Sequence, residues 1–333
     1  MEQLETRKKD HIDLAFKSQT GRPDRDYRFR YEPMLTAHPA GGLQPFTFLG
    51  KEHNVPMWVS SMTGGTKMAG TINRNLARAC NEFGMGMGLG SCRIIMEDDT
   101  FFEDFNMRPI IGPDLPLWAN LGIAQIEELL EENNVGKATN LVEKLEADGL
   151  IIHVNPMQEW FQPEGDILKI SPFEAITRFM EKFPYPMIVK EVGQGIGPKS
   201  LLKLLQLPLQ AIEFAAFGGT NFARVELLRD ENAEKALFEP LSLIGEDAYS
   251  MLEEINRITA GEKPACKELI ISGGIKDFLD GYYLVKKSSM PAVYGMASTF
   301  LKYAQEDYEQ LQAFVESQVK GLEMAYSYLT INE

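Results

Sequence analysis

The sequence has 333 residues, of which 44% are hydrophobic, so the chain can bury a large core; this length fits one α/β barrel as well as two smaller domains. The formal charge of −15, from 33 Lys and Arg against 48 Asp and Glu, disfavours binding to nucleic acid or to an anionic membrane surface. The three cysteines show no CxxC spacing, and no apolar run approaches the ~20 residues that span a bilayer, which predicts a cytoplasmic protein without disulfides, thiolate-bound metal or a membrane segment.

The first 45 residues are rich in charge and turns. Basic side chains cluster in RKKDHI, from Arg7 to Ile12, and recur between Arg22 and Arg30. In so acidic a chain, a basic arm is a candidate site for an anionic ligand. The alternative is a solvated, partly mobile terminus, which composition alone favours.

From Val55 onwards, short apolar runs bounded by glycine or proline alternate with amphipathic segments of helical spacing. Eight runs are candidate strands: Val55–Met62, Met85–Gly90, Leu117–Gly122, Leu150–Asn155, Pro186–Val192, Ala211–Phe217, Glu268–Gly274 and Ala292–Ala297. This alternation, with connections long enough for parallel crossovers, predicts an α/β fold of the (β/α)8 TIM barrel type. A doubly wound open sheet is the alternative, but no GxGxxG motif follows the first run.

The interval between the sixth and seventh runs, residues 218–267, is the longest. It predicts an insertion between strands 6 and 7 that holds an added helix or a lid over the strand ends. Residues 298–329 have helical spacing and should pack outside the barrel. No repeat or linker divides the chain, so we expect one barrel domain over 1–333, with an arm over 1–45, a core over 55–300 and a C-terminal helix over 301–333.

Polar residues gather directly after the fourth run. Ile151 and Ile152 end in a group made of His153, Asn155, Gln158 and Glu159, and the chain then turns through Pro163 to Asp166. Because ligands lie at the carboxyl ends of strands in α/β folds, this group can orient a polar ligand and coordinate a hard cation such as Mg²⁺. The alternative is a histidine satisfied by its neighbours beside a solvated acidic loop.

Glycines in the last two strand-to-helix turns let backbone N–H groups approach a phosphate closely. SGGIK, from Ser272 to Lys276, fits that use, and Lys276 can supply charge. Lys190, at the end of the fifth run, is a candidate buried cation facing an anionic ring or phosphate, unless it pairs with Glu191 or another carboxylate.

Cys92 offers a competing interpretation of the glycine-rich segment MGMGLGSCR. A cysteine at the rim of a phosphate-binding barrel is a possible nucleophile if a neighbour such as Arg93 lowers its pKa. No histidine-base motif accompanies it, so this interpretation ranks below the others.

Taken together, the motifs of the rim resemble the type 2 isopentenyl-diphosphate isomerases, flavin-dependent (β/α)8 enzymes related to the FMN-binding hydroxy-acid oxidases. The resemblance runs from Arg7 to about Leu301, in the family's order. The matching segments are RKKDH, SSMTGGT, GSCR, ANLG, HVNPMQEWFQPEGD, KEVGQGI, FGGTNFARVE and SGGI. The fifth of these is the most specific.

The resemblance implies two sets of site residues and a metal ligand. The positions that match FMN-binding ones are Ser61, Met62, Thr63, Ser91, Asn120, Lys190, Thr220, Gly273, Gly274, Ala297 and Ser298, with Lys276 at the phosphate turn. The positions that match substrate-binding ones are Arg7, Lys8, Ser91, Arg93, His153, Asn155 and Gln158. Glu159 matches the ligand of a Mg²⁺ ion that bridges the substrate diphosphate. The basic arm thereby gains an anionic ligand.

The reaction that the resemblance implies converts isopentenyl diphosphate to dimethylallyl diphosphate without net redox change. Reduced FMN is the implied acid and base, so NADPH is needed only to reduce the flavin. The expected catalytic residues are Gln158, which orients or relays a proton, His153, and Lys190, which stabilises negative charge on the reduced flavin. Because the family forms tetramers or octamers, we expect a homo-oligomer.

Two other functions stay open. An FMN-dependent oxidoreductase of a small hydroxy acid needs a catalytic histidine on the late strands, but all four histidines lie in the first half of the chain. A flavin-binding protein without catalysis needs neither Gln158 nor Glu159. The sequence departs from the family pattern at Cys92, Phe222 and Lys276, and in STFL at Ser298 to Leu301, but none of these changes removes a polar group assigned to chemistry.

Overall fold

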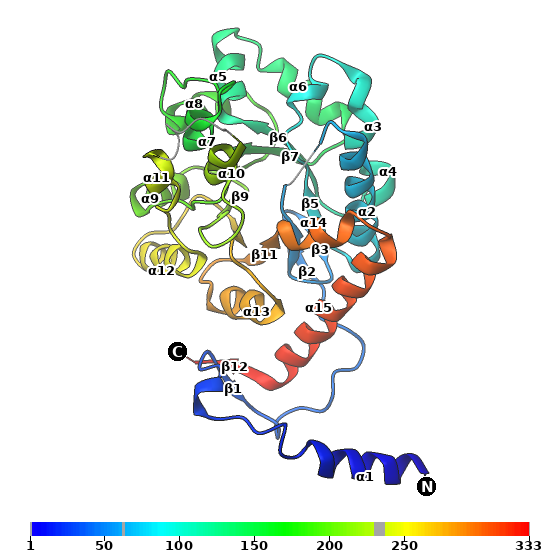
Figure 1. Cartoon of the computed structure of the whole chain (residues 1–333). Coiled ribbons are helices and arrows are strands. Elements are labelled where there is room, and N and C mark those ends of the chain that lie inside the picture. Colours follow the sequence, from blue (N-terminus) through cyan, green and yellow to red (C-terminus); the bar gives the residue numbers. More distant parts are fainter. Residues whose placement is uncertain (1, 62–63, 230–236, 333) are drawn as a thin grey trace.

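The computed structural model describes residues 2–61, 64–229 and 237–332, and its centre is a closed barrel of eight parallel strands (Figure 1). The barrel strands are β4 (Met57–Val59), β5 (Gly86–Gly88), β6 (Leu117–Gly122), β7 (Gly149–His153), β8 (Met187–Lys190), β9 (Ala211–Glu213), β10 (Glu268–Ser272) and β11 (Ala292–Met296). Each strand pairs with the next in chain order, and β11 closes the barrel by pairing with β4, Tyr294 opposite Met57. This closure confirms the predicted TIM barrel, because an open doubly wound sheet leaves two edge strands unpaired.

Helices surround the barrel (Figure 1). The helices between barrel strands are α2 (Lys67–Phe83), α3 (Phe102–Phe105), α4 (Arg108–Ile111), α5 (Ile123–Glu131), α6 (Gly136–Lys144), α7 (Pro156–Phe161), α8 (Pro172–Met180), α9 (Pro198–Leu205), α10 (Phe222–Arg229), α11 (Glu239–Ser242), α12 (Ala248–Thr259) and α13 (Phe278–Lys287), with 3-10 turns at Arg93–Ile95 and Asp99–Phe101. After β11 come α14 (Ser298–Ala304) and the long α15 (Tyr308–Tyr328). Within the described ranges, no helix combines the length and the apolarity needed to cross a bilayer.

The longest strand-to-strand interval holds the predicted insertion. It contributes α10 and α11 ahead of α12, which is followed by β10. α10 packs against α7, the short helix that follows β7. The insertion therefore covers part of the rim at which the polar residues of 153–159 lie.

Successive side chains of the barrel strands alternate between the interior and the surrounding helices. Trp58 and Trp118 belong to the interior cluster, whereas Met57 and Val59 belong to the larger core between strands and helices. The other strand residues of the interior cluster are Ile151, Ile188, Ala211, Ile270 and Val293. Alternation therefore gives the barrel an apolar interior as well as an apolar outer surface.

A hairpin of β2 (Phe46–Phe48) and β3 (Lys51–His53) closes one end of the barrel. Phe48 and Leu49 at its tip belong to the interior cluster. The Leu49 N–H donates to Glu268 Oε2 over 3.0 Å, and Glu268 is the first residue of β10. The closed end is therefore the one at which the strands begin, and the carboxyl ends form the other.

The N-terminal arm is paired with the other end of the chain. β1 (Phe29–Tyr31), which follows a 3-10 turn at Arg22–Asp24, runs antiparallel to β12 (Leu329–Ile331). The Phe29 ring packs against Tyr282 and Tyr283 of α13. The exposed helix α1 (Glu2–Leu14) lies outside the ring of helices, beyond this two-stranded sheet (Figure 1). The sequence predicted a basic arm but gave no sign of this pairing.

His53 is a buried histidine whose ring lies beside Phe46 and Phe48, with centroid distances of 5.7 and 5.6 Å. Neither ring nitrogen has a hydrogen-bond partner among the described residues, and burial lowers the pKa of His53 to about 4. The unfolded chain binds a proton here below about pH 6.5, so this side chain stabilises the fold above that pH and the contribution is lost as pH falls towards 4.

We expect the free energy of unfolding to fall by about 2 kcal/mol between pH 7 and pH 5 on account of His53 alone. Urea titrations at the two pH values measure the change. His53→Phe keeps an aromatic ring but cannot bind a proton, so it should make the fall smaller by that amount. The same pH dependence in both proteins would contradict the assignment.

Candidate functional site

In five barrel strands, the residue two positions after an apolar interior residue is polar. Because side chains alternate along a strand, the residue two positions after an inward apolar residue also points inward. On β6 to β10 these positions are Asn120, His153, Lys190, Glu213 and Ser272. We call these five residues the polar layer. It lies at the carboxyl end of the barrel, where (β/α)8 proteins bind their ligands.

A cavity of about 390 Å³ opens beside the polar layer. It is lined by Lys190, Glu213 and Ser272 of that layer, and by the turns that follow β9, β10 and β11. The predicted cofactor residues on its wall are Ser61, Lys190, Thr220, Gly273, Gly274, Lys276, Ala297 and Ser298. Residues that lie far apart in the sequence thus share one wall, and we call this space the glycine-lined cavity.

Two glycines after β10 shape the wall of this cavity. Gly273 and Gly274 have φ angles of +94° and +74°, in the left-handed region that favours glycine. A Cβ on Gly273 would overlap the backbone of Ala216, and a Cβ on Gly219 would lie 3.0 Å from the Gly274 nitrogen. The turns after β9 and β10 are therefore packed backbone against backbone. A wall of this kind suits a phosphate group, and the exposed Lys276 adds positive charge at its edge.

Several buried polar atoms on this wall lack a partner. Ser60 Oγ, Ser61 Oγ and Glu213 Oε2 have no hydrogen-bond partner within the part of the chain that the structure describes. All three residues line the glycine-lined cavity. Because unpaired buried polar groups are rare in folded proteins, these atoms indicate a ligand with both donors and acceptors. A flavin ring with a phosphate tail has that chemistry, so the residues present fit FMN.

His153 is held as a neutral imidazole. Asn120 Nδ2 donates to the Leu89 carbonyl over 2.9 Å, which leaves Asn120 Oδ1 to accept the proton of His153 Nδ1 at 2.8 Å. His153 Nε2 is then the acceptor atom of the ring. It lies close to Gly122, because a Cβ added to that glycine would be 2.9 Å from Nε2. Burial and the nearby Lys190 charge lower the pKa of His153 to about 3. At neutral pH this ring accepts hydrogen bonds from a ligand and carries no charge.

Lys190 places an ammonium group in the polar layer with only 6% of the residue exposed. Its Nζ donates to the backbone carbonyl of Glu191 over 2.7 Å. The Glu191 carboxylate instead accepts the N–H groups of Gly193, Gln194 and Gly195, and burial raises the pKa of Glu191. Lys190 therefore does not pair with the Glu191 carboxylate, and it lines the glycine-lined cavity.

A second polar group surrounds α7. Asn155 Nδ2 donates to Gln158 Oε1 over 3.2 Å and to Glu159 Oε1 over 2.9 Å. Gln158 Nε2 donates to Glu226 Oε1 of α10 over 3.1 Å, while Glu159 Oε2 accepts the Asp166 N–H over 2.9 Å. The segment of 155–166 that the sequence singled out is therefore one hydrogen-bonded group, and it keeps Gln158 and Glu159 in fixed orientations.

The other predicted residues lie at the edge of the α7 group or away from both groups. Arg93 is exposed and pairs with Asp166 over 3.2 Å, beside the α7 group, and Ser91 is exposed on the preceding turn. Arg7 and Lys8 lie on α1, outside the ring of helices (Figure 1). Met62 and Thr63 fall outside the described residues.

The buried Cys92 does not have the properties of a nucleophile. Its Sγ donates to the Gly90 carbonyl over 3.3 Å, and burial raises the pKa of Cys92 to about 12. A nucleophilic thiol must ionise near neutral pH and reach its substrate. This interpretation of the glycine-rich segment is therefore wrong.

Two carboxylates of the site escaped the sequence interpretation. Glu213 is fully buried, and its Oε1 accepts the Ser272 hydroxyl over 3.3 Å. The sequence feature that could have indicated Glu213 is its position as the one charged residue in the apolar run AIEFAAF, two residues after the inward-facing Ala211. Glu226 is 3% exposed, and only the packing of α10 on α7 brings it to Gln158. It ends the matching segment FGGTNFARVE, but that motif does not indicate its contact with Gln158.

Comparison with known proteins places this chain in a family. No protein-family model matches the chain. The chain is 35% identical over 322 residues to an isopentenyl-diphosphate delta-isomerase of a Nostoc species, which covers 94% of this chain and 88% of that protein. A protein of the same name from Rickettsia felis is 33% identical, over 84% of this chain and 78% of that one.

The chain belongs to the isopentenyl-diphosphate delta-isomerase family.

This member of the isopentenyl-diphosphate delta-isomerase family has a barrel similar to those of solved flavoenzymes. A flavocytochrome b2 variant with sulfite bound has a TM-score of 0.62 at 14% identity, over 90% of this chain and 71% of that one. A mandelate oxidase variant with a monooxide FMN adduct has a TM-score of 0.56 at 13% identity, over 92% and 88%. At these identities the likeness shows the shared barrel fold alone.

Proposed function

We propose that the protein converts isopentenyl diphosphate to dimethylallyl diphosphate, with FMN in the glycine-lined cavity and a Mg²⁺-bound diphosphate beside α7. One observation carries the proposal. Residues of the polar layer line the same cavity as Gly273 and Gly274, and β7, which ends in the polar layer at His153, leads directly into the hydrogen-bonded group of Gln158 and Glu159. The activity named for the relatives, on isopentenyl diphosphate, supports the diphosphate half of this arrangement.

The residues of the cavity would hold FMN in one orientation. Gly273, Gly274 and Lys276 would bind the phosphate, while the unpaired Ser61 hydroxyl would bond to the ring system. Thr220, Ala297 and Ser298 complete the wall. Ser91 and Asn120 do not line this cavity, so in the proposal Asn120 acts through His153, and Ser91 belongs with the substrate. The chemistry that FMN supplies when bound and reduced is the exchange of protons with the alkene, and NADPH is the proposed reductant.

The side chains of the polar layer and of α7 would bind and orient the substrate. Lys190 would place a buried positive charge against the reduced ring. Gln158, fixed by Asn155 and Glu226, would hold or pass a proton near the reacting carbons, and the neutral His153 would accept a hydrogen bond beside it. The His153 ring and the Asn155 and Gln158 amides are already hydrogen-bonded, so little reorganisation is needed when the substrate binds.

Glu159 is the proposed protein ligand of Mg²⁺. Mg²⁺ usually keeps several waters and is held by one or two carboxylates together with substrate phosphates. Among the described residues no group of three or more His, Cys, Asp or Glu side chains forms a complete metal site. The geometry therefore suits an ion that arrives with the diphosphate.

Glu159→Gln is expected to raise the KM for isopentenyl diphosphate at least about tenfold at limiting Mg²⁺, with partial recovery at high Mg²⁺. A titration of activity against both Mg²⁺ and substrate measures this. Glu164→Gln is the matched control, because Glu164 lies just after the helix that holds Glu159 but pairs with Arg229 over 3.0 Å. Equal effects of the two substitutions would contradict a metal role for Glu159.

Arg7 and Lys8 enter the proposal through α1. For these side chains to reach a diphosphate, α1 must pack against the carboxyl end of a barrel. That barrel is either its own or that of a second copy in a homo-oligomer such as a tetramer or octamer. The exposed Arg7 and Lys8 would then add positive charge beside the diphosphate.

The proposed function has a direct test. The purified protein is mixed with FMN, and the flavin spectrum is recorded; isopentenyl diphosphate, Mg²⁺ and NADPH are then added and the product is identified by NMR. We expect bound flavin and dimethylallyl diphosphate. A protein that does not bind FMN, or one that binds it and oxidises a small hydroxy acid without isomerising the alkene, would overturn the proposal.

A further inference from the structure

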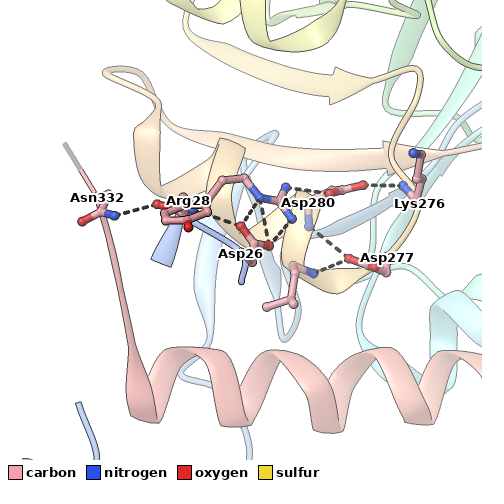
Figure 2. Close-up of polar contacts among 8 residues, drawn as sticks. Asp26, Arg28, Lys276, Asp277, Asp280 and Asn332 are labelled. Carbon is pink, nitrogen blue, oxygen red and sulfur yellow. Dashed lines mark hydrogen bonds and ion pairs between the residues drawn. The ribbon is translucent and has the colours of Figure 1, made fainter. Parts of the chain in front are cut away.

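A chain of ion pairs and hydrogen bonds connects the N-terminal arm to the turn that follows β10 (Figure 2). Asp280, in the first turn of α13, has its two carboxylate oxygens occupied by different partners. Oδ1 accepts from Arg28 over 2.7 Å, and Oδ2 accepts the backbone N–H of Lys276 over 2.9 Å. One carboxylate therefore links residue 28 to residue 276.

Asp280 fixes the end of the turn that lies beyond its two glycines, whose backbone packs against residues 216–219. Gly273 and Gly274 are adjacent glycines in left-handed conformations, and glycine loses more conformational entropy on ordering than any other residue. The turn is anchored at one end by β10 and at the other by the bond between Lys276 and Asp280. Without the second anchor, a ligand would have to order the turn when it binds, and its affinity would fall by that cost.

The capping of α13 leaves the turn as the phosphate-binding part. Asp277 Oδ1 accepts the N–H groups of Leu279 and Asp280 over 2.9 and 3.2 Å (Figure 2). The Lys276 N–H is bonded to Asp280. These N–H groups at the start of α13 are therefore already used, and on this side of the cavity the glycine amides and the Lys276 ammonium remain to bind an anion.

Arg28 determines how Asp280 is shared. Its guanidinium also bonds Asp26, with contacts of 2.7 to 3.2 Å, and its backbone carbonyl accepts the Asn332 N–H of the two-stranded sheet over 2.8 Å. A fixed Arg28 satisfies the negative charge of Asp280. If Arg28 were absent, that carboxylate would be available to the Lys276 ammonium, which would then be drawn away from the cavity.

We propose that Arg28 and Asp280 are positioning residues for the turn of residues 272–276, so that the paired N-terminal arm sets the affinity of the cavity for the phosphate of FMN. The inference rests on the proposed function, since it assumes that FMN is the ligand. Neither residue lines the cavity. Their effect passes through the backbone and the side chain of Lys276.

Two ligands separate this role from a general loss of stability. FMN and riboflavin share the ring system, but only FMN has the phosphate. The dissociation constants of both are measured for the flavin-free protein by quenching of flavin fluorescence. We expect Arg28→Gln and Asp280→Asn each to weaken FMN about fivefold or more, and riboflavin less than about twofold.

The two residues should also act as a pair. Arg28→Gln with Asp280→Asn together should weaken FMN no more than Asp280→Asn alone, because both remove one connection. Arg28→Lys keeps the charge and should recover most of the affinity. Asp26→Asn is the matched control: Asp26 contacts Arg28 but neither Asp280 nor Lys276, so FMN affinity should stay within about twofold of wild type.

The outcomes distinguish the inference from the proposed function. If wild-type protein binds FMN and the Arg28 and Asp280 variants bind it equally well, the inference is wrong and the proposed function stands. If the variants lose affinity for FMN and riboflavin equally and have a lower melting temperature, then Arg28 and Asp280 only stabilise the fold, and the inference is wrong. If wild-type protein does not bind FMN, the proposed function and the inference both fail.

Discussion

Gln158→Ala is expected to lower the turnover of isopentenyl diphosphate by about 100-fold or more while FMN stays bound with an affinity within about twofold of wild type. Gln158 does not line the glycine-lined cavity, so the flavin loses no contact. The variant removes the amide that Asn155 and Glu226 hold in place, and with it the group positioned to hold or pass a proton. Steady-state assays and a flavin titration measure the two quantities separately.

Gln162→Ala provides the matched control for this result. Gln162 lies at the end of the same helix, and its backbone N–H donates to the Gln158 carbonyl over 3.0 Å, a bond that the substitution keeps. We expect turnover within about threefold of wild type. Unchanged turnover in the Gln158 variant, or equal losses in both variants, would contradict the assigned role.

Gly273→Ala is expected to abolish flavin binding, with a loss of affinity of more than about 100-fold. The new Cβ would overlap the backbone of Ala216, which no rotamer change can relieve. The residue would also keep a φ of +94°, which adds about 1 to 2 kcal/mol of strain for an L side chain. The turn must therefore change shape, and the wall that would bind the phosphate changes with it. Flavin titration and thermal unfolding measure both effects.

Gly41→Ala separates the strain from the overlap. Gly41 has the same φ of +94°, but a Cβ there would meet nothing within 4 Å. Its substitution should cost no more than about 1 to 2 kcal/mol in the free energy of unfolding and should leave the affinity for FMN unchanged. If Gly273→Ala bound FMN as well as Gly41→Ala does, the glycine wall would not be the phosphate site.

The barrel was predictable because its signals are local. Each strand is a short apolar run, and in β7 and β8 the run ends at the polar residue that faces the mouth, His153 and Lys190. The run Leu117–Gly122 matches β6, whereas the other predicted runs were longer than the strands; Val55–Met62, for example, extends beyond β4 at both ends. The rim residues were found for the same reason: they directly follow the runs.

The features that the sequence did not reveal depend on contacts between distant segments. The pairing of β1 with β12, in which Phe29 lies opposite Ile331, joins the two ends of the chain. Neither segment has a sequence pattern that indicates this pairing. Glu226 reaches Gln158 only because α10 packs on α7. Glu213 could have been found by counting two residues on from an inward position, but only once the inward face of β9 is known.

The hairpin at Phe48 and Leu49 leaves the barrel with its base filled, so a molecule bound at the polar layer arrives and departs by the carboxyl end. In the proposed arrangement the flavin and the diphosphate share that route.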